Sequence, residues 1–225
     1  MAFTLPKGAR AVIERATSRG FTAEINNVPV GDHDMETLGD GKWLNDEVIN
    51  FYMQLIVSRS EQNPALPKVH AFNTFFYSTL RDQGYARVRR WTRRVNLFEK
   101  DMFIVPVHLG VHWCCAVVSF KAKAITYYDS LLGDNHKCLR LLMDYLHSEC
   151  KDKLGSAFDD SAWTMKCDKD IPRQQNGYDC GIFAATFAEY ASRDAPFMFG
   201  QGNCPYLRRK MIYEIATKSL ISMIV

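Results

Sequence analysis

The chain has 225 residues, of which 47% are apolar, and a formal net charge of +3. This length indicates one domain, or one domain with a small extension, and the apolar fraction excludes an intrinsically disordered chain. The charge is too small to indicate a nucleic acid, a membrane or any other charged partner by itself.

The cysteines show no spacing typical of a metal or redox site. There are seven cysteines, an odd number, and no CxxC pair occurs among them, so the spacing predicts neither a zinc site nor a redox pair. The first ten residues contain no apolar signal core, and no apolar run approaches the length of a membrane helix. We therefore expect an intracellular protein with reduced thiols, in which one special cysteine lies among several buried ones.

The N-terminal part of the chain reads mainly as helices separated by turns. Residues 8–20 fit a short helix, and residues 21–42 carry turn signals that predict a loosely structured lead-in with room for one edge strand. A clear helix opens at residues 43–47, where Asn45 or Asp46 can cap it and acids fill its first turn. Residues 70–80 are rich in aromatic side chains and predict a further packed helix.

Residues 87–94 contain five arginines around Trp91. Such a run can contact phosphates or the acidic surface of another protein. On the run alone, a solvated face is the better interpretation.

The second half of the chain combines strands and helices. The runs 113–120 and 124–129 are nearly all apolar, which indicates central strands covered on both faces. The expected elements are strands at 103–108, 113–120, 124–129 and 162–167, a helix at 137–150, a polar linker at 151–161, a helix from Cys180 to Ser192, and a last helix at 206–219. This mixture predicts an α+β fold.

A polar, glycine-containing loop leads to one cysteine, Cys180, and an apolar run with helical spacing follows it. A cysteine at a helix N-terminus has a stabilised thiolate and therefore a lowered pKa. Its own N–H could donate to a developing oxyanion, and Gln174 offers a second neutral donor. The alternative is an ordinary buried helix cysteine, which is the commoner case for a lone cysteine.

A cysteine nucleophile needs a base, and the base needs an orienting partner. His112 stands just before one predicted central strand, and Asp129 ends the next. If these strands pair antiparallel, His112 and Asp129 become neighbours, and the free imidazole nitrogen can face Cys180. Taken singly, His112 can be a structural histidine and Asp129 a turn or cap residue. Together with Gln174 and Cys180 they predict a catalytic triad with an oxyanion hole.

These residues and their surroundings resemble the SUMO-specific (sentrin-specific, Ulp-type) cysteine proteases. The Gln-x-Asn-x-x-Asp-Cys-Gly signature at residues 174–181 and a His-Trp pair with an acid 17 residues after the histidine are highly specific in combination. The other matching segments are residues 43–47, 50–52, 70–76, 90–92, 105–114 and 125–130. Residues 1–42 and 151–171 match poorly, and Tyr178 is bulkier than the small residue expected there.

The resemblance implies a papain-like α+β fold of the Ulp type, with a central mixed sheet flanked by helices. It assigns a triad and an oxyanion hole, a tunnel of two indoles around the Gly-Gly tail of the modifier, and contacts to the body of the modifier. The residues implied are His112, Asp129 and Cys180 for the triad, Gln174 for the oxyanion hole, Trp43 and Trp113 for the tunnel, and Asp46, Phe75, Arg90 and His108 for the body contacts. Arg90 is thereby reinterpreted as a partner contact.

The resemblance implies a thiol protease that cleaves after the Gly-Gly of SUMO, both in conjugates and in SUMO precursors. Residues 43–225 would be the catalytic domain and residues 1–42 a lead-in. Two alternatives remain open: the same fold acting on another ubiquitin-like modifier, and a binding module without activity. We expect no cofactor and no metal, a monomer whose partners are SUMO and SUMO-conjugated proteins, no nucleic-acid or membrane partner, and a nuclear or nuclear-envelope location, with the cytoplasm as the alternative.

Overall fold

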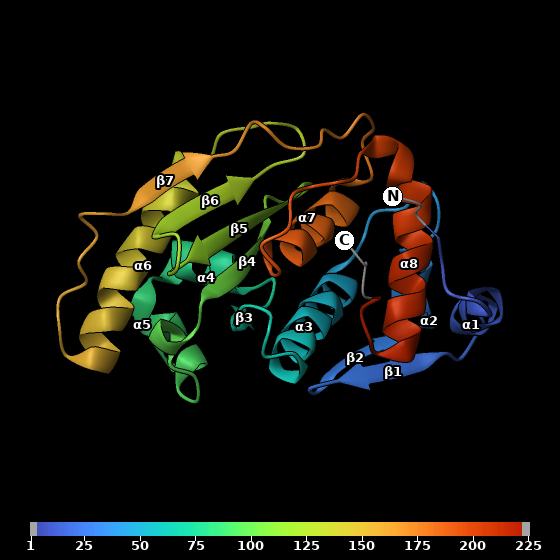
Figure 1. Ribbon diagram of the computed structural model, residues 1–225, viewed down its shortest axis with the longest axis horizontal. Coiled ribbons are helices and arrows are strands. Elements are labelled where there is room, and N and C mark those ends of the chain that lie inside the picture. The colour runs from blue at the N-terminus through green and yellow to red at the C-terminus, as the bar shows by residue number, and fades with distance from the viewer. Residues whose placement is uncertain (1–3, 222–225) are drawn as a thin grey trace.

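The computed structural model describes residues 4–221 and shows an α+β fold around one five-stranded sheet (Figure 1). The strand order is β3-β4-β5-β6-β7, and the strands are β3 (Val69–Ala71), β4 (Met102–His108), β5 (Trp113–Ser119), β6 (Ala124–Tyr128) and β7 (Thr164–Cys167). The central pairs β4·β5 and β5·β6 are antiparallel, whereas β3 and β7 run parallel to their neighbours. The predicted mixed sheet is therefore confirmed.

Helices cover both faces of this sheet. The helices along the described part of the chain are α1 (Ala9–Ala16), α2 (Asp32–Glu36), α3 (Asp46–Gln62), α4 (Phe76–Gln83), α5 (Tyr85–Val88), α6 (His136–Leu154), α7 (Cys180–Ala191) and α8 (Cys204–Thr217), with 3-10 turns η1 (Arg89–Thr92), η2 (Leu97–Glu99) and η3 (Gln201–Asn203). In Figure 1, α7 and α3 lie on one side of the strands and α6 and α4 on the other. Within residues 4–221, no helix has the length and apolar character needed to cross a bilayer.

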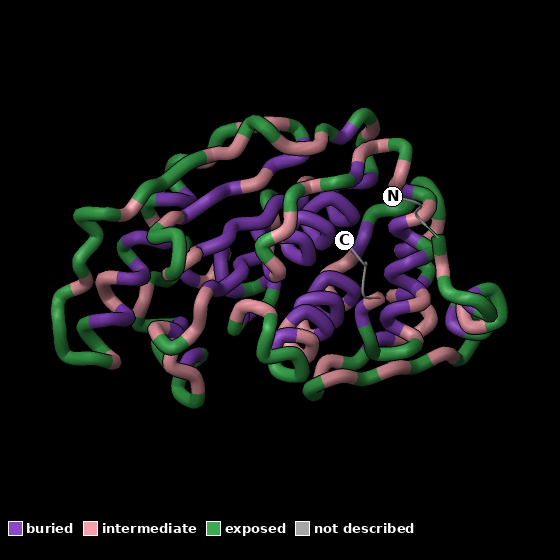
Figure 2. The backbone as a smooth tube through the Cα atoms, viewed as in Figure 1, coloured by how far each residue is buried: buried purple, intermediate pink, exposed green. Residues whose placement is uncertain are grey.

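The core consists of two apolar clusters separated by the sheet. Side chains alternate along β5, so that Trp113 and Cys115 belong to the cluster beneath α7, while Cys114 and Ala116 belong to the cluster beneath α6. Figure 2 shows this burial running through the central strands and the inner helices. The strands predicted to be covered on both faces are thus confirmed.

The lead-in at residues 21–42 is more ordered than predicted. It holds an antiparallel hairpin of β1 (Thr22–Ile25) and β2 (Val28–Gly31), followed by α2. Asn26 and Asn27 turn the chain with positive φ angles of 48° and 62°, the conformation that a two-residue hairpin turn requires. Val30 and Met35 are buried in the α7-side core, which holds the hairpin in place. Asn-Asn can adopt this turn, but it is a weaker sequence signal for a hairpin than Asn-Gly.

Two further predictions are corrected. Residues 69–71 form a strand rather than the start of a helix, because Val69 and Ala71 are buried in alternation and pair in parallel with Met102–Ile104. The helix begins only at Phe76. The helix predicted at 137–150 continues to Leu154 and is capped by Gly155, whose φ of 68° lies in the left-handed region that favours glycine. The linker after it is therefore shorter than expected.

Candidate active site

Cys180 is the first residue of α7 and is buried beside β5. The helix approaches the segment before α3 so closely that a Cβ on Gly181 would lie 2.8 Å from Cβ of Leu44. Only glycine fits there without displacement of the neighbour. The indole Nε1 of Trp113 donates to the Leu44 carbonyl oxygen at 3.0 Å, so the same segment is also joined to β5. The close packing places the N-terminus of α7 against the start of β5.

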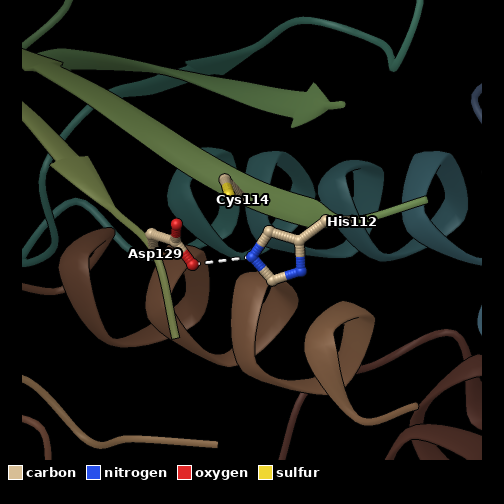
Figure 3. A group of neighbouring side chains, drawn as sticks. All are labelled: His112, Cys114 and Asp129. Atoms are coloured by element: carbon tan, nitrogen blue, oxygen red, sulfur yellow. Dashed lines mark hydrogen bonds and ion pairs between the residues drawn. The ribbon is translucent and has the colours of Figure 1, made fainter. Parts of the chain in front are cut away.

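His112 and Asp129 meet across the start of β5 and the end of β6, as the strand pairing predicted. Nε2 of His112 lies 2.6 Å from Oδ1 of Asp129, and Figure 3 shows the other imidazole nitrogen pointing away from the carboxylate. Asp129 also accepts from the backbone N–H groups of Leu131 at 2.8 Å and Gly133 at 3.1 Å. A Cβ on Gly133 would meet Asp129 Oδ2 at 2.5 Å, so this residue must be glycine for the loop to enclose the carboxylate.

These contacts set the ionisation of the acid and the histidine. Burial alone would raise the pKa of Asp129, but the bonds from His112, Leu131 and Gly133 outweigh it and lower that pKa. Burial alone would lower the pKa of His112, but hydrogen bonding, first of all to Asp129, raises it well above that of an ordinary histidine. An ionised carboxylate beside a protonated imidazole is therefore favoured.

The pKa of the Cys180 thiol is lowered despite its burial. Burial acts to raise it, but hydrogen bonding to His112 and to the backbone N–H groups of Trp113 and Gly181 more than compensates. The neighbouring thiol behaves differently, because burial raises the pKa of Cys114. Of these two cysteines, only Cys180 thus has the electrostatic character of a nucleophile.

Gln174 is buried next to the same loop. Its Oε1 accepts from Oγ of Ser130 at 2.7 Å, and its Nε2 donates to the carbonyl of Asn176. Since an amide nitrogen carries two hydrogens, one N–H of Gln174 remains for another acceptor. The N–H of Cys180, at the start of a helix, has no acceptor within that helix. The sequence-predicted oxyanion donors therefore lie in the loop that contains the nucleophile candidate.

Sequence reasoning missed Arg208 and assigned no role to Asp179 of the signature; together these two residues hold this loop. Nε and Nη2 of Arg208 donate to Oδ1 of Asp179 at 3.1 and 2.7 Å, and both side chains are buried. The same guanidinium donates to the carbonyls of Gly39 and Lys42, each at 2.8 Å. It therefore joins the nucleophile loop to the chain just before Trp43. Arg208 gave no sequence signal, because its partners come from distant segments.

The predicted substrate-contacting residues lie in two places. Near the predicted triad, His108 stacks on Trp113 with ring centroids 4.1 Å apart, and Trp43 is 54% exposed beside the buried Leu44. Asp46 begins α3 and is half-buried. Farther along the chain, Phe75 precedes α4 with 53% of its surface exposed, and Arg90 is exposed on η1.

The arginine run is held by α6. The buried carboxylate of Glu149 accepts from the hydroxyls of Tyr85, at 2.7 Å, and Thr92. Nζ of Lys153 also donates to the carbonyl of Arg89 at 3.1 Å. These contacts fix the backbone of the segment that carries Arg90 while leaving Arg90 itself exposed.

Cys114 is a further residue that sequence reasoning did not single out. It lies beside His112 and Asp129, and the three side chains place ligand atoms within 4.8 Å of one another (Figure 3). Such a group has the composition of a metal site, but His112 and Asp129 are already paired with each other. The signal that could have indicated Cys114 is its position two residues after His112, because side chains two residues apart along an extended chain point to the same face.

Most of this chain is similar to a known protein family and to proteins of that kind. Residues 42–220 match the Ulp1 protease family, C-terminal catalytic domain. A sentrin-specific protease of Caenorhabditis elegans is 48% identical over 224 residues, covering 98% of this chain and 32% of the relative. Human sentrin-specific protease 2 is 43% identical over 190 residues, covering 84% of this chain and 32% of the relative. The chain thus spans about a third of the length of these relatives.

Solved structures agree in fold. The C-terminal Ulp1 protease domain in complex with Smt3, the yeast ortholog of SUMO, matches with a TM-score of 0.80 and 32% identity, covering 95% of this chain and 96% of that one. A structure of the SUMO protease Ulp1 with its catalytic cysteine oxidised to a sulfenic acid matches with a TM-score of 0.81 and 32% identity, covering 96% of each chain. The predicted papain-like α+β fold of the Ulp type is confirmed.

Proposed function

The chain belongs to the Ulp1 protease family, and we propose that it is a thiol protease specific for SUMO. It would cleave after the C-terminal Gly-Gly of SUMO, releasing SUMO from lysine side chains and trimming SUMO precursors. The observation that carries the proposal is the pairing of His112 with an ionised Asp129 next to Cys180, whose pKa is lowered. The names of the relatives, sentrin-specific protease among them, support the substrate class.

The proposed reaction uses the chain's own residues in two steps. The Cys180 thiolate attacks the carbonyl carbon of the terminal glycine, while the N–H of Cys180 and the free N–H of Gln174 stabilise the oxyanion. His112 gives its proton to the leaving lysine amine as the C–N bond breaks. Water, deprotonated by His112, then hydrolyses the thioester and frees the carboxylate of SUMO. Asp129 orients the imidazole and stabilises its cationic form throughout.

Specificity for Gly-Gly would come from Trp43 and Trp113. Two indoles close over a tail that has no side chains, so any larger residue in the tail is excluded sterically. The hydrogen bond from Trp113 to the Leu44 carbonyl supports this, since it joins the segment of Trp43 to the strand of Trp113. Asp46, Phe75, Arg90 and His108 are proposed to contact the body of the modifier.

The remaining assignments are proposals of the same kind. Residues 43–225 would be the catalytic domain, with residues 1–42 as a lead-in. We propose a monomer in the nucleus or at the nuclear envelope, whose partners are SUMO and SUMO-conjugated proteins. A nucleic-acid partner would rest only on residues 87–94, and it would require binding that weakens steeply with salt.

The test is incubation of the protein with modifiers that carry a C-terminal electrophile: SUMO, ubiquitin and a third ubiquitin-like protein. A covalent adduct at Cys180 with SUMO alone is expected. An adduct with a different modifier would keep the mechanism and overturn the substrate. If the folded protein binds SUMO but gives no adduct with any of the three, the chain is a binding module.

A further inference from the structure

A second group of metal-ligating side chains lies outside the active site. Among residues 4–221, Asp134, His136 and Cys167 each place one ligand atom within 4.8 Å of the other two. Asp134 and His136 flank the start of α6, and Cys167 ends β7. We propose that these three side chains form a zinc-binding site, which joins β7 to the loop between β6 and α6.

The donor set decides the class of metal. A thiolate and an imidazole are ligands of the kind that zinc prefers, whereas magnesium and calcium prefer oxygen alone. The carboxylate and thiolate together supply two negative charges, which balance Zn²⁺. Three protein ligands leave the fourth tetrahedral position to water. On binding, the Cys167 thiol proton is released to solvent and the sulfur coordinates as a thiolate.

Hydrogen bonds of Asn135 and the pairing of β6 with β7 already hold this region together. The N–H of Asn135 donates to Sγ of Cys167 at 3.3 Å, and the side chain of Asn135 donates to the hydroxyl of Tyr127 at 3.3 Å. Tyr127 in turn pairs with Cys167 across β6 and β7. The ligands are therefore positioned by a strand pair and by the residue between Asp134 and His136, so little chain ordering is needed on binding.

The site is accessible to a metal in solution. Cys167 is half-buried, whereas the other six cysteines are fully buried, and Asp134 and His136 are exposed. One competitor is present: Nζ of Lys169 lies 2.7 Å from Oδ1 of Asp134. Lys169 also donates to the carbonyl of Leu132 at 2.6 Å, so it can keep a partner when Zn²⁺ takes the carboxylate.

The loop that carries the proposed site also contacts the triad residue Asp129. The same loop supplies the N–H groups of Leu131 and Gly133 to Asp129, and the Ser130 hydroxyl to Gln174. A metal bound at the end of this loop would restrain the segment that orients both groups. The inference does not rest on the proposed function, because zinc binding can be measured without a substrate.

Cobalt(II) is the probe, because thiolate ligation gives a charge-transfer absorption that zinc then abolishes by displacement. The experiment uses the Cys180→Ser variant, which lacks the reactive thiolate and leaves the proposed site unchanged. We expect about one equivalent of Co²⁺ to bind with the thiolate band. A second substitution, Cys167→Ser, should abolish the band. His136→Gln should weaken Co²⁺ binding at least about tenfold, since losing even a residue that only hydrogen-bonds a metal ligand costs about that much affinity.

Two further variants separate this site from the triad cluster. Cys114→Ser removes a ligand of the His112, Cys114 and Asp129 group and should leave the band unchanged. Lys169→Met removes the competitor of Asp134 and should tighten binding several-fold, and weaker or unchanged binding would contradict Asp134 as a ligand. A band that survives Cys167→Ser, a band that disappears with Cys114→Ser, or no band in the Cys180→Ser protein would each overturn the proposal. Circular dichroism checks folding, and His136→Gln carries the test if Cys167→Ser does not fold.

Discussion

Arg208 and Asp179 form a buried ion pair directly before the nucleophile candidate, with Nη2 of Arg208 2.7 Å from Oδ1 of Asp179. The guanidinium also satisfies the carbonyls of Gly39 and Lys42. One side chain from α8 thus ties together the loop before Cys180 and the chain that leads to Trp43. The loop of the candidate active site is therefore held by a residue that is not itself one of the proposed triad or tunnel residues.

The first prediction concerns this ion pair. Arg208→Leu leaves the Asp179 carboxylate buried without its cation, so we expect unfolding to become easier by about 3–5 kcal/mol. Reaction of Cys180 with a SUMO electrophile should also slow, because the loop is no longer held. Denaturant unfolding and adduct kinetics measure the two effects. The matched control is Arg209→Leu, the adjacent exposed arginine, which should change stability by less than about 0.5 kcal/mol. Equal effects of the two variants would contradict the positioning role.

The second prediction separates two neighbouring cysteines. Cys180→Ser should reduce kcat by at least about 10⁴-fold, because a serine here lacks the lowered pKa that makes the thiolate. SUMO binding should be retained, since the substitution is small. Cys114→Ser is the matched control and should keep near-wild-type turnover, because burial keeps Cys114 in its neutral form. Turnover of a SUMO precursor reads out both variants, and an active Cys180→Ser enzyme would contradict the nucleophile assignment.

The third prediction is a pH profile. The reactive form is the thiolate, so the alkylation rate of Cys180 should rise with pH through a pKa below that of an ordinary thiol. The imidazolium should persist above the roughly 6.5 of an ordinary histidine, because the pKa of His112 is raised. Activity should therefore be lost in acid and maintained through neutral pH.

Asp129→Asn tests the cause of the raised histidine pKa. Loss of the carboxylate should lower the pKa of His112, move the alkaline limb of the profile to lower pH, and reduce kcat by about 10²–10⁴-fold. A variant with reduced kcat but an unshifted alkaline limb would show that Asp129 acts through structure alone.

The fourth prediction concerns the oxyanion donors. Gln174→Ala removes one N–H donor and should reduce kcat by about 10²–10³-fold with little change in KM, because the bond forms mainly in the transition state. The exposed neighbour Gln175→Ala is the control: the backbone N–H of Gln175 donates to Oε1 of Gln201, and the substitution leaves that bond in place, so this variant should retain activity. A rise in KM alone for Gln174→Ala would assign this residue to substrate binding instead.

The fifth prediction concerns the proposed tunnel. Trp43→Ala should lower kcat/KM for SUMO substrates and relax the exclusion of a Gly-Ala tail, while stability changes little because Trp43 is 54% exposed. Competition between Gly-Gly and Gly-Ala substrates measures the discrimination. Unchanged discrimination would show that Trp43 does not enclose the tail.

Local sequence patterns predicted those helices and strands whose apolar residues recur regularly along the chain. The strands at 103–129 and the helix that begins at Cys180 follow from such runs, because a strand covered on both faces must be apolar throughout. The hairpin at residues 22–31 and the strand at 69–71 were missed for the opposite reason. Each is short, and its pairing partner, not its own composition, stabilises it.

The sequence by itself predicted the triad of His112, Asp129 and Cys180, because these residues stand at the ends of predictable elements, where the family motif is also strongest. Only the tertiary structure revealed Arg208 beside Asp179 and the group of Asp134, His136 and Cys167. Asp179 and Arg208 are far apart along the chain, as Cys167 is from Asp134 and His136, and no periodicity links them. Hydrogen bonds and metal ligation depend on distances of a few ångströms, and those distances are set by how α8 and β7 pack rather than by any local run of residues.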